Sequence, residues 1–97
     1  MSKPGFTNIP KSCLVTGGSG FVGQRLVEML VERGCKRVVS FDVAPKPKDS
    51  LDRKEIEYIQ GDLTDPQVVL DAAKGVEAVF HIAALVSAIT ELYQLYT

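Results

Sequence analysis

The sequence has only two cysteines in 97 residues, and its charges nearly cancel, with a formal net charge of −1. Two cysteines cannot build the disulfide framework of a small secreted domain. Because positive and negative charges balance, the chain lacks the excess of basic residues with which proteins bind nucleic acids or anionic membranes. No apolar run approaches the ~20 residues that a membrane-spanning helix needs. We therefore expect one small globular domain in a reducing compartment, on the cytoplasmic side, with no nucleic-acid partner.

A cluster of glycines separates an apolar run from an apolar-periodic segment. Residues 12–16 are predicted to form a strand and residues 20–33 a helix, with a tight turn between them. Glycines in such a turn let a pyrophosphate approach without a Cβ in its way, and the N–H groups at the helix start hold the anion. The spacing G-x-x-G-x-x-G therefore favours a dinucleotide site. Its predicted contacts are Gly17, Gly20, Phe21, Val22 and Gly23.

Two other interpretations of this cluster compete with the dinucleotide site. A phosphate-binding P-loop needs lysine and then serine or threonine after its last glycine, but Gln24 and Arg25 stand there. The second alternative is a glycine turn that binds nothing. The strand before the cluster and the helix after it favour the dinucleotide site over this alternative.

The rest of the chain alternates strands with helices. Residues 1–11 are predicted to be an irregular leader without a secretory signal, and residues 12–97 one domain. The alternation is typical of an α/β domain with a parallel sheet, here in the strand order 3-2-1-4 with helices on both faces. The apolar last strand is predicted to be covered on both faces. The remaining elements are strands over 37–42, 56–60 and 76–83, a loop over 44–55 with one helical turn near 50–54, and a helix from the turn at 61–66 to Lys74.

The two cysteines fall at the start of the first strand and just after the first helix. We expect Cys13 and Cys35 at the end of the sheet away from the glycines. They are interpreted as free thiols, and a contact between them stays open.

Asp42 ends the second predicted strand, in the position of the acidic residue about 20 residues after the glycines. A carboxylate there accepts hydrogen bonds from the adenosine ribose and repels a 2′-phosphate, which predicts NAD rather than NADP. Lys46 and Lys48 follow closely and partly offset this repulsion. The alternative is a solvated aspartate at a strand end, which the spacing from the glycines disfavours.

Four short motifs occur in order, and together they resemble the extended short-chain dehydrogenases/reductases. They are the glycine motif at 16–23, Asp42, Gly-Asp-Leu-Thr-Asp at 61–65 and His-Ile-Ala-Ala at 81–84. The resemblance covers residues 12 to about 87 and implies a partial Rossmann-type fold that binds NAD. It further implies that Asp62 and Leu63 flank the adenine and that Ala83 and Ala84 lie near the rest of the cofactor.

Residues 79–87 are similar to the 3β-hydroxysteroid dehydrogenase branch of this family, which includes the sterol-4α-carboxylate 3-dehydrogenases. This resemblance implies a parent enzyme that oxidises the 3β-hydroxyl of a steroid or sterol by hydride transfer to NAD. The sterol-like substrate would bind only in that longer parent. Two alternatives stay open: the N-terminal half of a sugar-nucleotide epimerase, which shares all four motifs, and a non-catalytic NAD(H)-binding module.

The family's catalytic Tyr-x-x-x-Lys pair has no counterpart in this sequence. No lysine follows Lys74, and Thr97 stands four residues after Tyr93. We assign no catalytic residue and no metal ligand, and we expect the chain to be a truncated cofactor-binding half that is inactive alone. His81 lies in an apolar strand and is interpreted as a packed, hydrogen-bonded core histidine.

Residues 88–97 are predicted to form a short amphipathic helix, with Ile89, Leu92, Tyr93 and Tyr96 on one face. Packing of this face on the sheet is favoured, and binding of a partner is the alternative. Truncation would also leave the apolar fourth strand at the edge of the sheet. Because an exposed apolar edge invites pairing, we expect the chain either to self-associate through it as a homo-oligomer or to be marginally stable.

Overall fold

The computed structural model describes residues 9–95 of the chain. Residues 1–8 of the predicted leader lie outside them, and residues 9–11 form neither helix nor strand. Within residues 9–95, no helix combines the length and the apolar composition that a membrane crossing requires. The elements are β1 (Ser12–Thr16), α1 (Phe21–Glu32), β2 (Arg37–Asp42), β3 (Ile56–Gln60), α2 (Pro66–Ala73), β4 (Ala78–His81) and α3 (Ile82–Leu95).

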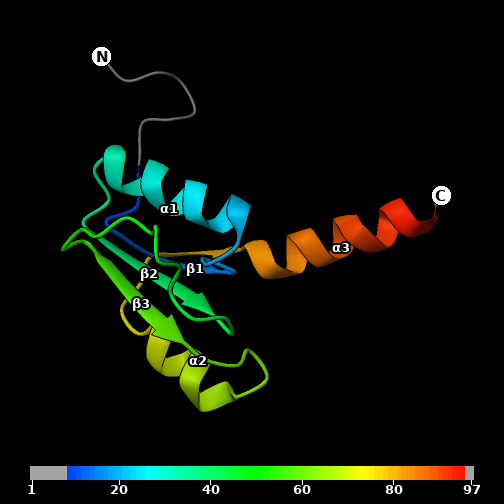
Figure 1. Cartoon of the computed structure of the whole chain (residues 1–97). Coiled ribbons are helices and arrows are strands. Elements are labelled where there is room, and N and C mark those ends of the chain that lie inside the picture. The colour runs from blue at the N-terminus through cyan, green and yellow to red at the C-terminus, as the bar shows by residue number, and fades with distance from the viewer. Residues whose placement is uncertain (1–8, 96–97) are drawn as a thin grey trace.

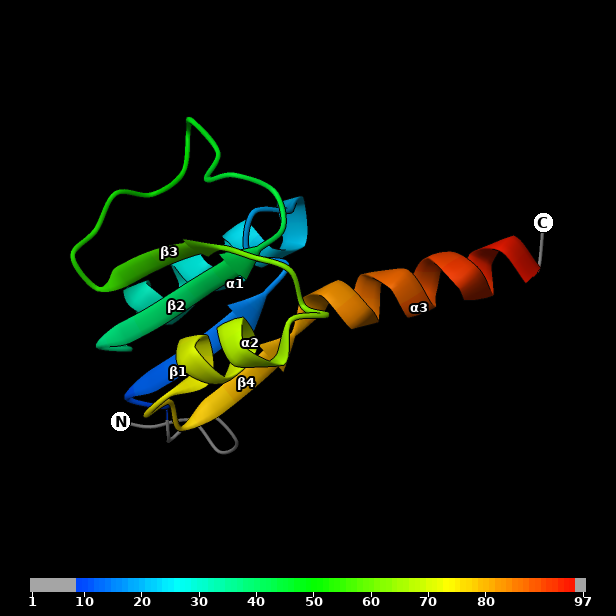
Figure 2. The ribbon, with the colours of Figure 1, turned by 90° about the horizontal axis from the view of Figure 1, so that it is seen from below.

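The four strands form one parallel sheet in the order β3-β2-β1-β4, which confirms the predicted topology. Thr16 at the end of β1 pairs with Phe41 of β2 on one side and with His81 of β4 on the other. Figures 1 and 2 show α1 on one face of the sheet and α2 on the other. Because all four strands run in one direction, their carboxyl ends meet at a single edge.

The core consists of two layers, one under each helix. The residues of β1 and β2 alternate between these layers, so each strand is buried on both faces. The layer under α1 contains Cys13, Val15, Val27, Leu30, Val31, Cys35, Val38 and Ile56. The smaller layer under α2 contains Leu14, Val39, Phe41 and Ala72.

Helix α1 buries the face that its sequence period predicts, formed by Gly23, Val27, Leu30 and Val31. It begins one residue later and ends one residue earlier than the predicted 20–33. Gly34 then takes a left-handed conformation with φ of +99°, and its N–H donates to the carbonyl of Val31. This glycine ends the helix because other residues adopt that conformation only with strain.

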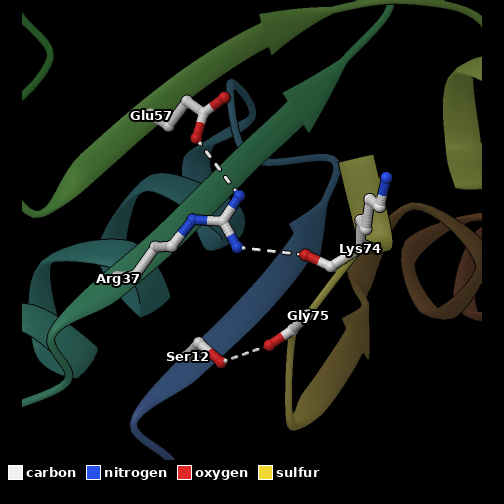
Figure 3. Close-up of polar contacts among 5 residues, drawn as sticks. All are labelled: Ser12, Arg37, Glu57, Lys74 and Gly75. Carbon is white, nitrogen blue, oxygen red and sulfur yellow. Dashed lines mark hydrogen bonds and ion pairs between the residues drawn. The ribbon is translucent and has the colours of Figure 1, made fainter. Parts of the chain in front are cut away.

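Helix α2 is fixed at both ends. At its amino end, Asp65 accepts from the N–H groups of Gln67 and Val68. At the other end, Arg37 of β2 donates to the carbonyl of Lys74 over 3.2 Å and lies 3.4 Å from a carboxylate oxygen of Glu57. Figure 3 shows these contacts beside the hydrogen bond from the Ser12 hydroxyl to the carbonyl of Gly75, which is 3.1 Å long. These contacts tie the turn after α2 to the amino ends of β1 and β2.

The connection over residues 43–55 contains no helical turn, so the prediction of one near 50–54 is wrong. Ser50 instead closes a tight turn, because both its N–H and its hydroxyl donate to the carbonyl of Pro47. The Tyr58 hydroxyl donates to the carbonyl of Leu51 and fastens the connection onto β3. The two prolines favour this turn over a helix.

The boundary between β4 and α3 differs from the prediction. The strand covers only residues 78–81 of the predicted 76–83, and the helix begins at Ile82 rather than at residue 88. The alanines that follow have high helix propensity and continue the chain as α3. Strand β4 is also not covered on both faces, because Val79 is 55% exposed. Within residues 9–95 it lies at the edge of the sheet.

The first residue of α3, Ile82, packs against the core layer under α1, but residues 88–95 are all exposed and do not pack on the sheet, so that part of the prediction is also wrong. The helix projects from the carboxyl end of β4 (Figure 1) and buries none of its residues. It starts directly after the strand, without the loop that would turn it back onto a sheet face. Tyr96, the last residue of its predicted face, lies outside the described residues. The large apolar residues that α3 exposes are Leu85, Val86, Ile89, Leu92, Tyr93 and Leu95.

Candidate cofactor site

The glycine loop joins β1 to α1 and is held against the end of β2. The N–H groups of Gly17 and Gly18 both donate to the carbonyl of Phe41, over 2.8 and 3.2 Å. Gly17 has φ of +74°, and a Cβ there would lie 2.9 Å from the backbone nitrogen of Ala83. The loop can therefore close only with glycine at this position.

The other two motif glycines serve different purposes. A Cβ on Gly23 would lie 1.9 Å from the carbonyl oxygen of Gly17, so the first turn of α1 can rest on the loop only without a side chain. A Cβ on Gly20 would come no closer than 3.5 Å to that oxygen, an ordinary contact. Gly20 also has a backbone conformation open to any residue. Its missing side chain leaves space above the helix end rather than inside the fold.

The amino end of α1 is the positive end of the helix dipole, and no group of the helix itself neutralises it. Among residues 9–95 no side chain caps it, and no acidic residue lies in its first turn. The first N–H groups of a helix have no partner within the helix, and they favour an anion. Phe21 is almost fully exposed at this end, beside the half-exposed Val22. The site therefore combines backbone donors for an anion with apolar side chains around them.

Backbone donors hold Asp42 at the carboxyl end of β2. The N–H of Ser19 donates to one carboxylate oxygen and the N–H of Ala44 to the other, each over 3.0 Å. Since each carboxylate oxygen can accept more than one hydrogen bond, Asp42 can still accept from the hydroxyls of a ligand. The first of these bonds also links Asp42 directly to the glycine loop.

The end of β3 brings the Gly-Asp-Leu-Thr-Asp motif next to Asp42. The N–H of Gly61 donates to the carbonyl of Asp42 over 2.9 Å. Asp62 follows, and its carboxylate accepts from both the N–H and the hydroxyl of Thr64, over 2.9 and 2.8 Å. These hydrogen bonds lower the pKa of Asp62 and so keep it ionised.

Two cavities of about 320 and 200 Å³ lie along this edge of the sheet, and Gly17, Asp42 and Ala83 line both. Of the predicted site residues, only Ala84 lines neither, and it is exposed on the first turn of α3. The larger cavity also contacts Gly20, Phe21, Val22, Gly23, Ile82 and Val86. The smaller one also contacts Phe41, Val43, Gly61, Asp62 and Leu63.

Five of these lining residues were not predicted from the sequence. Val43 and Gly61 adjoin predicted site residues, so their place in the chain could have indicated them. Phe41 resembles any buried strand residue. Ile82 and Val86 line the larger cavity only because α3 begins six residues early.

His81 connects the ends of β1 and β4. Its ring nitrogen Nδ1 lies 2.6 Å from the hydroxyl oxygen of Thr16, directly before the glycine loop. The predicted hydrogen bond is present, but the predicted core position is wrong, because His81 is exposed on an edge strand. The contact positions the start of the loop.

Lys46 is oriented toward β3. Its Nζ lies 4.7 Å from the centre of the Tyr58 ring, within cation–π distance. Lys46 lines a separate cavity that it shares with Ser19 and Gln60. Within residues 9–95, no cluster of three or more histidine, cysteine, aspartate or glutamate side chains could hold a metal ion.

Comparison with known proteins extends these observations. A model of the 3-beta hydroxysteroid dehydrogenase/isomerase family matches residues 14–95. The chain is 51% identical over 71 residues to a 2-alkyl-3-oxoalkanoate reductase of Stenotrophomonas maltophilia (strain K279a), covering 73% of this chain and 21% of the relative. It is 45% identical over 73 residues to a 3 beta-hydroxysteroid dehydrogenase/Delta 5-->4-isomerase of Mycobacterium tuberculosis (strain CDC 1551 / Oshkosh), covering 75% and 19%.

Among solved structures, the chain is similar to MoeE5 in complex with UDP-glucuronic acid and NAD, with a TM-score of 0.61 and 37% identity. This match covers 72% of the chain and 21% of MoeE5. The chain thus spans about a fifth of the length of the relatives it matches. The family model matches most of the chain, and the glycine loop, Asp42 and the two remaining motifs lie at one edge of the sheet. The chain therefore belongs to the 3-beta hydroxysteroid dehydrogenase/isomerase family.

Proposed function

We propose that this chain forms the NAD-binding part of an oxidoreductase that oxidises the 3β-hydroxyl of a steroid or sterol. Two adjacent features support this proposal: the amino end of α1 is open and uncapped, and the glycine loop before it holds the carboxylate of Asp42. Gly20 leaves the helix end accessible, and the N–H of Ser19 fixes Asp42 beside it. A dinucleotide needs both features, one for its pyrophosphate and one for its ribose.

The residues have distinct parts in this proposal. The backbone N–H groups at the start of α1 would hold the pyrophosphate, and Asp42 the adenosine ribose. Asp62 and Leu63 would flank the adenine in the smaller cavity, while Ala83 and Ala84 would lie toward the rest of the cofactor. The nicotinamide, when bound, accepts the hydride. The steroid or sterol would bind only in a longer parent.

Two other functions have a specific observation in their favour. The 97 residues contain no Tyr-x-x-x-Lys pair, which favours a non-catalytic NAD(H)-binding module for the chain as it stands. Turnover of any secondary alcohol by the purified chain would contradict that function. The similarity to MoeE5, solved with UDP-glucuronic acid, favours a sugar-nucleotide enzyme as the parent.

We place the parent on the cytoplasmic side, in the cytosol or at the surface of the endoplasmic reticulum membrane. The free thiols of Cys13 and Cys35 fit a reducing compartment. We also propose a homo-oligomer that forms through the exposed edge of the sheet. Strand β4 offers unpaired backbone groups at that edge, next to the exposed apolar residues of α3.

NADH should stabilise the chain more than NADPH does. A ligand that binds only the folded state raises the free energy of unfolding by ~2.7 kcal/mol at a hundred times its dissociation constant. Asp42 should repel the 2′-phosphate of NADPH, and Lys46 lies over Tyr58 rather than beside Asp42 as a counter-charge. Thermal unfolding of the chain alone, with NADH and with NADPH measures both effects. An equal response to the two cofactors would contradict the role of Asp42, and no response to either would contradict the site.

Replacing Asp42 with asparagine should weaken NADH binding about tenfold and narrow the preference for NADH over NADPH. The substitution removes a charged acceptor whose hydrogen bonds are worth ~1.5–3 kcal/mol each. Titration of both cofactors, followed by NADH fluorescence, measures the change. Asp49→Asn is the matched control, because Asp49 is an exposed carboxylate in the connection after β2. Unchanged affinities in Asp42→Asn would rule out the contact to the ribose.

Gly20→Ala and Gly23→Ala should separate binding from folding. At Gly20 the new methyl group has room, so the free energy of unfolding should change by less than about 1 kcal/mol. NADH affinity should nevertheless fall at least about tenfold, because the methyl group occupies the approach to the helix end. At Gly23 the methyl group overlaps the Gly17 carbonyl, and unfolding should become easier by about 3 kcal/mol or more. Urea unfolding and NADH titration test both variants; full NADH affinity in Gly20→Ala would count against the site.

The isolated chain should self-associate, and Val79→Lys should reduce this association. Val79 is 55% exposed on the edge strand, and a lysine there blunts edge pairing. Leu70→Lys on α2 is the control, because Leu70 is similarly exposed but belongs to a helix rather than to the edge strand. Sedimentation velocity over a concentration series measures the mass. A wild-type monomer at tens of micromolar would contradict the homo-oligomer.

A further inference from the structure

The two cysteines of the chain touch each other at the end of the sheet away from the glycine loop. The Sγ atoms of Cys13 and Cys35 lie 3.5 Å apart, although 22 positions separate the residues in sequence. Cys13 belongs to β1, and Cys35 lies between α1 and β2. Both side chains are part of the core layer under α1. Neither cysteine lines the cavities of the candidate cofactor site.

The two thiols have different surroundings. Cys13 is fully buried, and this burial together with its hydrogen bond to Cys35 raises its pKa to about 12. Its sulfur therefore stays protonated at neutral pH. The thiol of Cys35 also contacts the carbonyl of Arg37 over 3.4 Å. Cys35 thus lies between Cys13 and the polar start of β2.

Both cysteines are buried, but only Cys35 of the two borders a cavity, and Cys35 is 2% exposed. A cavity of about 340 Å³ reaches it at the amino edge of the sheet, lined by Gly34, Cys35, Lys36, Lys54 and Glu55. Cys13 does not line this cavity. Gly34 leaves open space beside it, since even a Cβ there would meet no atom within 4 Å. Because Cys35 borders this cavity and Cys13 does not, a peroxide that enters the fold from the cavity meets Cys35 before Cys13.

We propose that Cys13 and Cys35 are a disulfide modification site that a peroxide oxidises through Cys35. In the first step the Cys35 sulfur attacks hydrogen peroxide, the O–O bond breaks, and a sulfenic acid and one water form. In the second step the Cys13 sulfur attacks the Cys35 sulfur and forms the S–S bond. The S–O bond breaks, and the hydroxyl leaves with the Cys13 proton as a second water. Two thiols are oxidised to one disulfide while one peroxide is reduced to two waters.

The short distance between the two sulfur atoms means that the second step needs only small movements. The sulfur atoms must approach from 3.5 Å to the ~2.05 Å of an S–S bond, and they already share one packed layer. The bond would close a loop that contains the whole glycine turn and α1. Such a cross-link removes conformations from the unfolded chain and so stabilises the fold. The inference does not depend on the proposed function, because neither thiol contacts the cofactor site.

The first experiment uses the folded 97-residue chain and hydrogen peroxide. After free thiols are blocked with N-ethylmaleimide, the intact mass should show a monomer that lacks two hydrogens and carries no blocking group. Trypsin should then release residues 12–25 joined to residues 34–36, and dithiothreitol should separate them. The oxidised monomer should unfold roughly 5–15 °C above the reduced one.

Single variants test the order of the two steps. Cys13→Ala should leave Cys35 as a sulfenic acid that dimedone traps, whereas Cys35→Ala should leave Cys13 unreacted. Circular dichroism checks that each variant is folded. If a variant does not fold, the peptide map of the wild-type chain still tests whether the disulfide forms. A disulfide that forms only between chains, or only after unfolding in guanidinium, would overturn the proposal. So would an oxidised monomer that unfolds below the reduced one, or dimedone trapping at Cys13 rather than at Cys35.

Discussion

The contact between Gly23 and the carbonyl of Gly17 is the constraint on which the candidate site depends. It lets the first turn of α1 rest on the loop that leaves β1, with no room for a side chain between them. The same loop closes onto β2 through the two N–H groups that share the Phe41 carbonyl. The glycine loop therefore packs against β1, α1 and β2 together, and this packing fixes the direction of the helix dipole.

This packing also explains how a carboxylate and an anion-binding helix end lie side by side. Two backbone N–H groups donate to the carboxylate oxygens of Asp42 and hold it at the carboxyl end of β2. One of these donors, Ser19, belongs to the glycine loop itself. The loop therefore fixes the position of the Asp42 carboxylate and leaves the first N–H groups of α1 available for the anion of a ligand.

Local periods and local turn chemistry predicted most of the fold. The buried face of α1 depends on the apolar period within the helix, and the strand order depends on the handedness of crossovers. The errors cluster at β4, where the apolar sequence predicts cover on both faces. Cover depends on which segments pack there, and in this structure α3 leaves the edge bare. The exposure of His81 and the cavity contacts of Ile82 follow from that single difference.

The carboxyl end of the sheet is open, whereas its amino end is held together by hydrogen bonds and packed side chains. At the carboxyl end the helix is uncapped, a glycine is open, and exposed apolar side chains surround the backbone donors. At the amino end Arg37 and Ser12 occupy the carbonyls of the turn after α2, and the two cysteines fill the layer under α1. A parallel sheet makes this division available, because every strand begins at one edge and ends at the other. Contacts that stabilise the fold can then tighten at one edge without filling the space that a ligand needs at the other.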